Sequence, residues 1–154
     1  MTSAILKHTE SIRFILAGNS TFTVLNTKTQ KRFTFKVKAA RNSTIEKPLF
    51  FVKVLTNPEI YQFIGSIFSK TFKYSQKSKI SSEAQSVAVF QYIFTKLLDG
   101  TLDSCVEIWH EGRCGRCGRQ LTVPDSIVNG IGPECGKMMN LSSIRQRKIN
   151  KILE

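Results

Sequence analysis

Residues 32–38 read Arg-Phe-Thr-Phe-Lys-Val-Lys, so that polar and apolar side chains alternate along the whole segment. Successive side chains of a β-strand point to opposite faces of its sheet, and the three apolar residues of this segment therefore share one face. Residues 21–25 alternate in the same way, and the polar residues 26–30 separate the two segments. The pattern predicts a β-hairpin with one buried face.

The flanking segments extend this hairpin into a sheet. Residues 49–55, Leu-Phe-Phe-Val-Lys-Val-Leu, are almost wholly apolar, which is typical of a strand buried on both faces. Residues 61–68 predict a further strand, and the apolar-rich residues 11–17 predict one ahead of the hairpin. We therefore expect an antiparallel sheet of about five strands between residues 10 and 80.

A helix is expected after the sheet. Ser82 and Gln85 fit the capping box, in which a hydroxyl and a side chain three residues later satisfy free backbone amides. Apolar residues recur at helical spacing from Val87 to Leu97, and Gly100 is placed to end the helix. Residues 104–110 then predict a strand. The predicted helix would pack its apolar face on the sheet.

Composition limits the class of protein. The chain has 154 residues, 41% of them hydrophobic, including eleven Phe, which is enough for a packed core. No apolar run approaches the roughly 18–20 residues of a membrane span, and the first residues do not resemble a signal peptide. We therefore expect a cytoplasmic protein with no membrane partner. In that reducing compartment, closely spaced cysteines favour a metal or redox site over a disulfide.

The chain is strongly basic. Lys and Arg number 23 against 11 Asp and Glu, for a formal net charge of +12. The charge is also segregated, because residues 27–53 contain eight basic side chains and one acidic one, whereas residues 81–112 are net acidic. This distribution favours an anionic partner, with nucleic acid first.

Residues 110–135 read HEGRCGRCGRQLTVPDSIVNGIGPEC and contain three of the four cysteines, Cys114, Cys117 and Cys135. Two cysteines separated by two residues on a Gly-rich turn, with a third further on, are typical of a zinc knuckle. A structural zinc site has four ligands. His110 is our first candidate for the fourth ligand, and Cys105 is the alternative.

Other functions of these cysteines are weaker hypotheses. A redox pair would lie at a helix N-terminus, without a third cysteine nearby. A catalytic zinc needs a general base, and Glu111 directly follows His110, whereas zinc deaminases place one residue between the two. No phosphate loop or Ser-His-Asp set is present in the sequence. We therefore predict a protein that is not an enzyme and that has no small-molecule substrate.

The same 26 residues resemble a small zinc-binding domain of unknown function that is found in bacteriophage and bacterial proteins. The resemblance rests on Gly-Arg-Cys-Gly-Arg-Cys-Gly-Arg, Leu-Thr-Val-Pro-Asp-Ser-Ile and Gly-Ile-Gly-Pro-x-Cys. It implies a phage-encoded accessory protein of the host cytoplasm. It also implies that Cys114, Cys117 and Cys135 are ligands and, less directly, His110, whereas Cys105 lies outside the motif.

Two basic regions predict where nucleic acid would bind. A metal-pinned loop would present Arg113, Arg116 and Arg119, whose guanidinium groups suit phosphate oxygens and guanine edges. The second region is the polar face of residues 32–38, with Arg32, Lys36 and Lys38. The arginines could instead be solvated or could balance the charge of the thiolates.

An alternative hypothesis is a protein-binding modulator. Such a protein would inhibit a host nuclease, a polymerase or another nucleoprotein machine.

The predicted architecture is α+β in three parts. Residues 1–100 would form a basic antiparallel sheet with one packed helix. Residues 101–140 would form the zinc-knuckle module, and residues 141–154 a basic helical tail.

Overall fold

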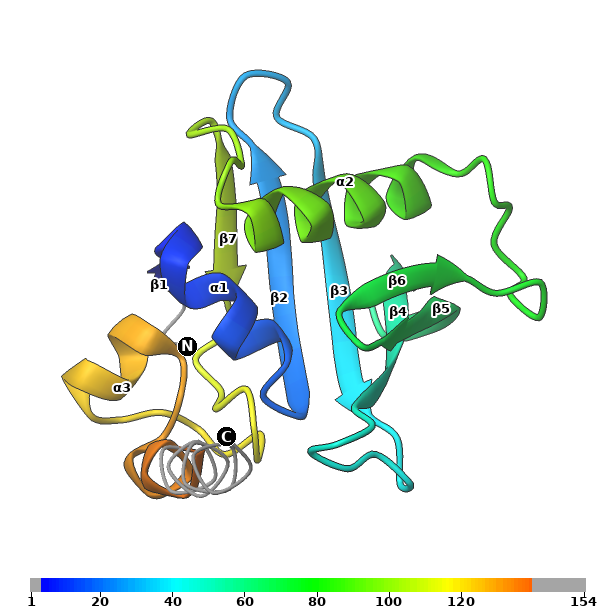
Figure 1. Cartoon of the computed structure of the whole chain (residues 1–154). Coiled ribbons are helices and arrows are strands. Elements are labelled where there is room, and N and C mark those ends of the chain that lie inside the picture. Colours follow the sequence, from blue (N-terminus) through cyan, green and yellow to red (C-terminus); the bar gives the residue numbers. More distant parts are fainter. Residues whose placement is uncertain (1–3, 140–154) are drawn as a thin grey trace.

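The computed structural model of the chain describes residues 4–139 and shows an α+β fold built on a seven-stranded antiparallel sheet (Figure 1). The strands lie in the order β1-β7-β2-β3-β4-β5-β6. The elements are β1 (Ala4–Leu6), α1 (His8–Ile15), β2 (Asn19–Asn26), β3 (Arg32–Ala39), β4 (Leu49–Asn57), β5 (Ile60–Phe68), β6 (Thr71–Tyr74), α2 (Gln85–Asp99), β7 (Val106–His110) and α3 (Pro124–Asn129).

The predicted hairpin is confirmed as β2 and β3. Phe22 lies opposite Phe35 on the buried face, while Thr23 lies opposite Thr34 on the other face, where the two hydroxyl groups are 2.7 Å apart. The predicted strands at residues 49–55 and 61–68 correspond to β4 and β5. Strands β2 to β6 follow one another in chain order, so this part of the sheet is a meander built from local pairings.

The strand before the cysteines, β7, occupies an interior position of the sheet. It pairs with β2 on one side and with β1 on the other, so that Trp109 lies opposite both Thr23 and Ile5. The segment that leads into the cysteine-rich loop is therefore held by hydrogen bonds along both edges. A strand at residues 104–110 was expected, but its place between β1 and β2 depends on pairings between distant parts of the chain.

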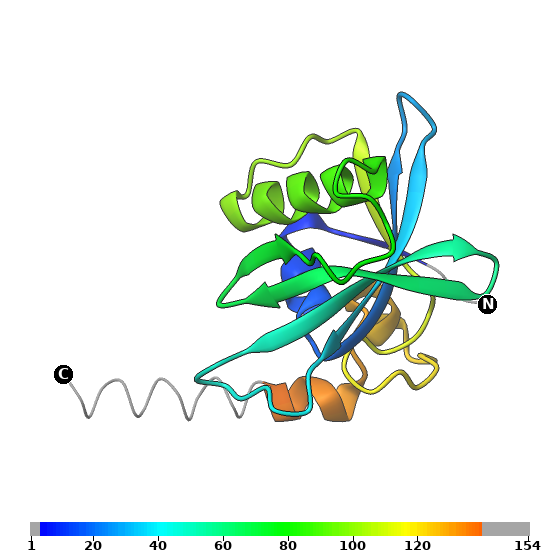
Figure 2. The ribbon, with the colours of Figure 1, turned by 90° about the vertical axis from the view of Figure 1, so that its right-hand side faces the viewer.

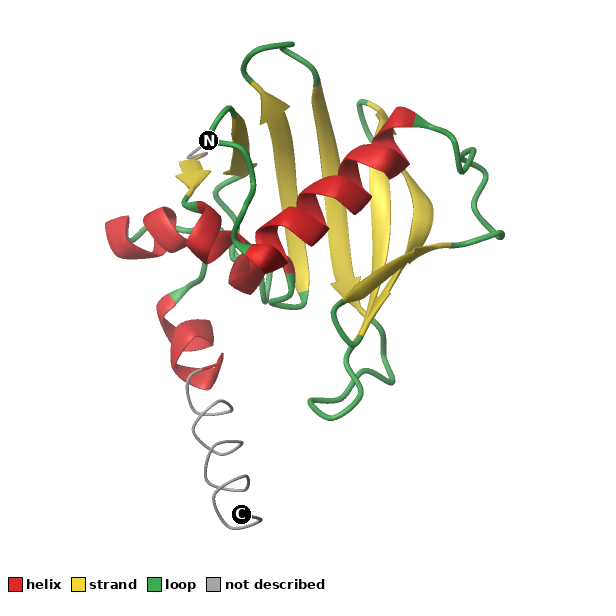
Figure 3. Ribbon diagram, turned by 45° about the horizontal axis from the view of Figure 1, so that its top comes forward, coloured by secondary structure: helices red, strands yellow, loops and turns green. Residues whose placement is uncertain are grey.

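Two expectations about strands were wrong. Residues 11–17 are not a strand, because residues 8–15 form α1, which buries Ser11, Phe14 and Ile15 at helical spacing. Strand β4 is buried on one face only: Val52 is fully buried, whereas Phe51 is 41% exposed. Both α1 and α2 cover the same face of the sheet, which leaves the face with Phe51 open (Figures 2 and 3).

The core lies between this covered face and α2. Phe90 of α2 packs against Phe35 and Phe72, with ring centroids 5.1 and 4.8 Å apart, respectively. Gly100 ends the helix in the left-handed conformation, as predicted. The expected capping box is not formed, because the N-cap residue is Ala84 and no side chain caps the helix.

The last described residues, 133–139, are helical. The predicted basic tail at residues 141–154 lies outside the described residues. Among residues 4–139, no helix combines the length and the apolar character that crossing a membrane requires.

Candidate metal centre

Three cysteines from two segments meet beside the sheet. Cys114 and Cys117 lie in the loop after β7, and Cys135 lies in the helical segment 133–139. Their Sγ atoms all lie within 4.8 Å of one another, so together they could hold a metal ion. All four cysteines are free thiols. The structure therefore brings together the three residues that the spacing in the sequence had selected.

Backbone hydrogen bonds shape the loop around the first two cysteines. The amide of Cys114 donates to the carbonyl of Arg119, and the amide of Gly118 donates back to the carbonyl of Cys114, both at 2.8 Å. Gly118 has a φ of +79°, a left-handed conformation that glycine adopts without strain. The repeated Gly-Arg-Cys units therefore form a tight turn that places both thiols on the same side.

Hydrogen-bond donors also surround the sulfur atoms. Burial would raise the pKa of the Cys114 thiol, but the backbone amides of Gly132, Cys117 and Arg116 together lower it below its ordinary value. Burial raises the pKa of the Cys135 thiol, an effect that the Arg116 guanidinium partly offsets. The Gly132 amide lies 3.3 Å from Sγ of Cys114. These donors stabilise the thiolate form, which is the form that binds metals.

The cysteine loop is docked on the body of the protein through small residues. Gly115 and Gly130 both lie against the ring of Phe14 in α1, where an added Cβ atom would approach ring carbons to 2.7 and 2.5 Å, respectively. The amide of Asn19, the first residue of β2, donates to the carbonyl of Gly115 at 2.7 Å. Cys114 itself is 1% exposed and belongs to the hydrophobic core. The cysteine group is thus continuous with the core.

His110, the first candidate for a fourth ligand, is not brought into the cysteine group. Its Nδ1 accepts a hydrogen bond from the amide of Gly112 at 2.9 Å, so this nitrogen carries no proton. Its Nε2 therefore carries the proton and donates to the carbonyl of Ile127 at 2.5 Å. Both nitrogens of this buried ring are occupied by the protein, which leaves no lone pair for a metal. His110 instead ties the end of β7 to α3.

We predict that His110→Ala keeps its metal and loses stability. The substitution removes a buried ring and leaves the Gly112 amide and the Ile127 carbonyl without hydrogen-bond partners. Each polar group left unpaired costs about 1–3 kcal/mol of stability. Metal analysis and chemical denaturation of the purified variant check both parts. Complete loss of metal at an unchanged free energy of unfolding would contradict this structural role.

The alternative fourth ligand, Cys105, is also outside the group. It precedes β7 at the end of the strand opposite His110, and its backbone carbonyl accepts hydrogen bonds from the amide and the hydroxyl of Thr27. Among the described residues, only the three clustered cysteines form a group of His, Cys, Asp or Glu side chains suited to a metal.

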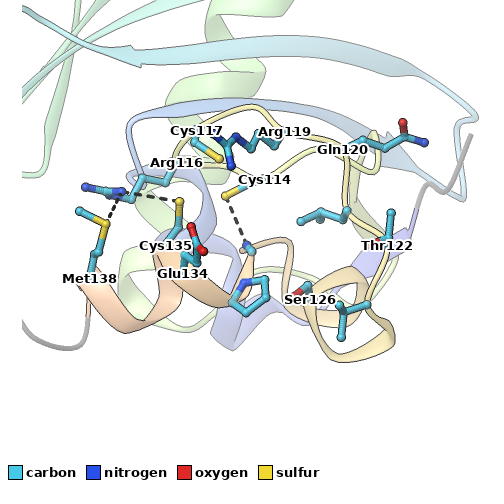
Figure 4. A pocket seen from close by; sticks show the side chains of 14 residues that line it. Cys114, Arg116, Cys117, Arg119, Gln120, Thr122, Ser126, Glu134, Cys135 and Met138 are labelled. Carbon is cyan, nitrogen blue, oxygen red and sulfur yellow. Dashed lines mark hydrogen bonds between the residues drawn. The ribbon is translucent and has the colours of Figure 1, made fainter.

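A cavity of about 380 Å³ lies next to the three sulfur atoms (Figure 4). Arg116 donates to Sγ of Cys135 at 3.6 Å and to Sδ of Met138 at 3.4 Å, so one of the three predicted arginines faces the cysteine group itself. Arg119 also lines the cavity and is exposed. Arg113 does not line the cavity; it is exposed and donates to the carbonyl of Gly118. The arginines are therefore not equivalent: Arg116 donates to a cysteine sulfur, and Arg119 faces solvent.

The basic residues of β3 lie on the open face of the sheet. Arg32 and Lys38 are exposed and Lys36 is half-buried, in contrast to the buried Phe35 and Val37 between them. At one end of this face, Arg32 and Trp109 line a second cavity of about 490 Å³. The period-two pattern therefore predicted correctly which side chains of β3 point away from the core.

Sequence reasoning missed the residues that support the cysteine group. The ring of Phe14 contacts Gly115 and Gly130. The backbone amide of Asn19, in β2, donates a hydrogen bond to the carbonyl of Gly115 in the cysteine loop. In the sequence, Asn19 follows Gly18, and such a Gly-Asn pair indicates a turn but not a contact with a distant loop. No local pattern identifies Phe14, because its partners lie about 100 residues away in the chain.

Comparison with known proteins gives one match. The model of a family of unknown function, DUF6011, matches residues 109–140, the part of the chain that contains the cysteine group. The chain is thus similar to that family over about a fifth of its length. Neither the curated proteins nor the solved structures contain a match.

Proposed function

We propose that this protein binds nucleic acid through a basic surface formed by a zinc-pinned cysteine loop and the open face of the sheet. We propose for it an accessory role of the phage type, in which it recognises nucleic acid without catalysing a reaction. The observation that carries the proposal is that the two basic regions predicted from the sequence adjoin one another in the fold.

The junction between the two regions is Asn19. Its neighbour in the sheet is Lys38, and both residues occupy open-face positions of their strands. On its other side, Nδ2 of Asn19 lies 3.1 Å from the position that a Cβ atom of Gly118 would occupy. Gly118 directly precedes Arg119. The cations of β3 therefore lead to the arginine-bearing loop with a single polar residue between them.

The donor set fits zinc as the resident metal. Thiolates are soft ligands that select zinc among the common divalent ions of the cytoplasm, and zinc accepts three of them together with a fourth ligand. Amides and a guanidinium directed at the sulfur atoms are the outer contacts that such a centre needs. Bound there, zinc would hold the loop rigid. The chain would then supply recognition through Arg113, Arg119 and the cations of β3.

A surface of this kind would bind the phosphate backbone of a nucleic acid. Each phosphate that a Lys or Arg side chain neutralises releases condensed counterions, so that affinity falls steeply as salt concentration rises. Arginine and lysine contacts of this type supply affinity and register, and base contacts supply any sequence preference. Binding at low salt with a steep salt dependence is therefore the expected signature.

We predict that replacing Arg32, Lys36 and Lys38 together by Gln weakens nucleic-acid binding and flattens its salt dependence. Each lost phosphate contact should reduce the slope of log affinity against log salt by about 1, and the triple variant should therefore lose about 3. Fluorescence anisotropy with labelled DNA and RNA over a series of salt concentrations measures both quantities.

The matched control removes three positive charges elsewhere. Lys77 and Lys79 lie in the loop before α2, and Lys96 lies on α2, which covers the opposite face of the sheet. Their replacement by Gln lowers the net charge equally and should leave most of the affinity and slope intact. Equal effects of the two triple variants would indicate attraction by net charge alone. Absence of binding by the unmodified protein at low salt would refute the proposed function.

A further inference from the structure

We infer that the β4–β5 half of the open sheet face is a stacking platform for the bases of single-stranded nucleic acid. This inference rests on the proposed function and names its substrate class. It concerns aromatic residues that neither the charge pattern nor the cysteine motif had indicated: Phe51, Tyr61 and Phe63.

Two phenylalanines form a pair on this face. Phe51 of β4 is 41% exposed, and its ring lies 6.0 Å from that of Phe63 on β5, at an interplanar angle of 77°. Neither ring is directed at the core, because the neighbouring Val52 and Ile64 take up the buried positions. Exposed apolar residues scattered singly are common on protein surfaces, but a paired aromatic cluster is typical of a binding site.

Lysines surround the aromatic pair. Lys38 lies directly opposite Phe51 in the register of β3 and β4, and Lys53 lies opposite Phe63 in that of β4 and β5. Lys36 lies opposite Lys53 and places its Nζ atom 4.6 Å from the centre of the Tyr61 ring. Each of these three aromatic rings is therefore next to a lysine that could hold a phosphate.

This arrangement selects single strands over the other candidate partners. The bases of a duplex are stacked on one another. A duplex would therefore contact the lysines through its phosphates but would have no free base to stack on the aromatic rings. Unstacked bases of a single strand can lie on aromatic side chains while basic residues follow the backbone. A purely apolar protein partner would leave the lysines without counter-charges. Charge complementarity and aromatic rings on the open face together fit a single-stranded polyanion.

The platform is continuous with the basic surface described above. Lys38, which faces Phe51 across one strand pair, faces Asn19 across the other, and Asn19 abuts Gly118 of the cysteine loop. A single strand lying on the rings of β4 and β5 could therefore extend over β3 and β2 to Arg119. The metal-pinned loop would then hold one end of the bound strand.

The test compares ring removal with charge removal in the full chain. Phe51→Ala and Phe63→Ala should each weaken binding to a labelled dT oligonucleotide longer than about 16 nucleotides by roughly tenfold, since one stacked base is lost in each case. The salt slope should stay unchanged, because no phosphate contact is removed. Phe51→Trp keeps a stacking face and should retain affinity, whereas Phe51→Leu keeps only apolar volume and should not.

Tyr92→Ala is the matched control, because it removes an aromatic ring that is 45% exposed on α2, which covers the opposite face. It should leave binding unchanged. If Phe51→Ala and Phe63→Ala bind the oligonucleotide as tightly as the unmodified protein while the triple β3 variant binds weakly, the platform is refuted and the proposed function stands. Tighter binding of a duplex of the same length would also refute the platform. Loss of all binding by the unmodified protein would refute both.

Discussion

Replacing Cys114 by Ser is expected to reduce the metal content from one ion per chain to almost none and to destabilise the cysteine loop. A serine hydroxyl is a poor ligand for the metals that bind thiolates. Cys114 is also only 1% exposed, and its Sγ atom accepts a hydrogen bond from the amide of Gly132. The substitution therefore alters a buried side chain of the core. In small zinc domains, metal binding contributes about 10–16 kcal/mol to folding. Elemental analysis and thermal unfolding measure the two effects.

The matched control is Cys105→Ser, which changes the one cysteine outside the group. This variant should keep its full metal content and most of its thermal stability. The opposite result, with metal lost from Cys105→Ser and kept by Cys114→Ser, would show that the group of three is not the ligand set. A disulfide between Cys114 and Cys117 in the protein isolated from a reducing cytoplasm would favour the redox hypothesis instead.

Gly130→Ala is expected to destabilise the protein by about 2–5 kcal/mol. Gly130 has a φ of +76°, and a side chain in this left-handed conformation costs about 1–2 kcal/mol. The new methyl group would also approach ring carbons of Phe14 to 2.5 and 2.8 Å. Overpacking of a well-packed core costs about 1–3 kcal/mol more. The free energy of unfolding, measured with urea, reports the sum.

Gly100→Ala separates these two costs. Gly100 has a similar φ of +72°, but an added Cβ would have nothing within 4 Å. The free energy of unfolding of this variant should therefore fall only by the cost of backbone strain. Gly130→Ala should in addition weaken metal retention, since it pushes the cysteine loop away from α1. Equal losses of stability in the two variants would mean that the loop does not pack on Phe14.

How much could be predicted from the sequence differs between local and long-range features. The alternation in residues 32–38 and the helical spacing from Val87 to Leu97 were sufficient to place β3 and α2, because a strand and an amphipathic helix repeat at different periods. The segment at residues 11–17 was assigned wrongly. A short apolar run does not distinguish a helix from a strand. In the structure this segment forms the helix α1, whose apolar side packs against β2 and α2.

The candidate site divides in the same way. The spacing of Cys114, Cys117 and Cys135 predicted the group that the structure brings together. His110 was chosen as a fourth ligand because it is near these residues in the sequence. The pairing of β7 between β1 and β2 directs its ring into the core, where Gly112 and Ile127 occupy both nitrogens. Proximity along the chain did not indicate the direction of the side chain.

By itself, the sequence determined the period-two strands, the cysteine group and the excess of positive charge. These features depend on neighbouring residues or on composition, and short-range geometry suffices to specify them. Three features instead arise from tertiary contacts: β7 lies inside the sheet, α1 and α2 cover one face, and Phe51 and Phe63 remain on the other face beside lysines. Those outcomes depend on hydrogen bonds and packing between residues far apart in the chain, which no local pattern encodes.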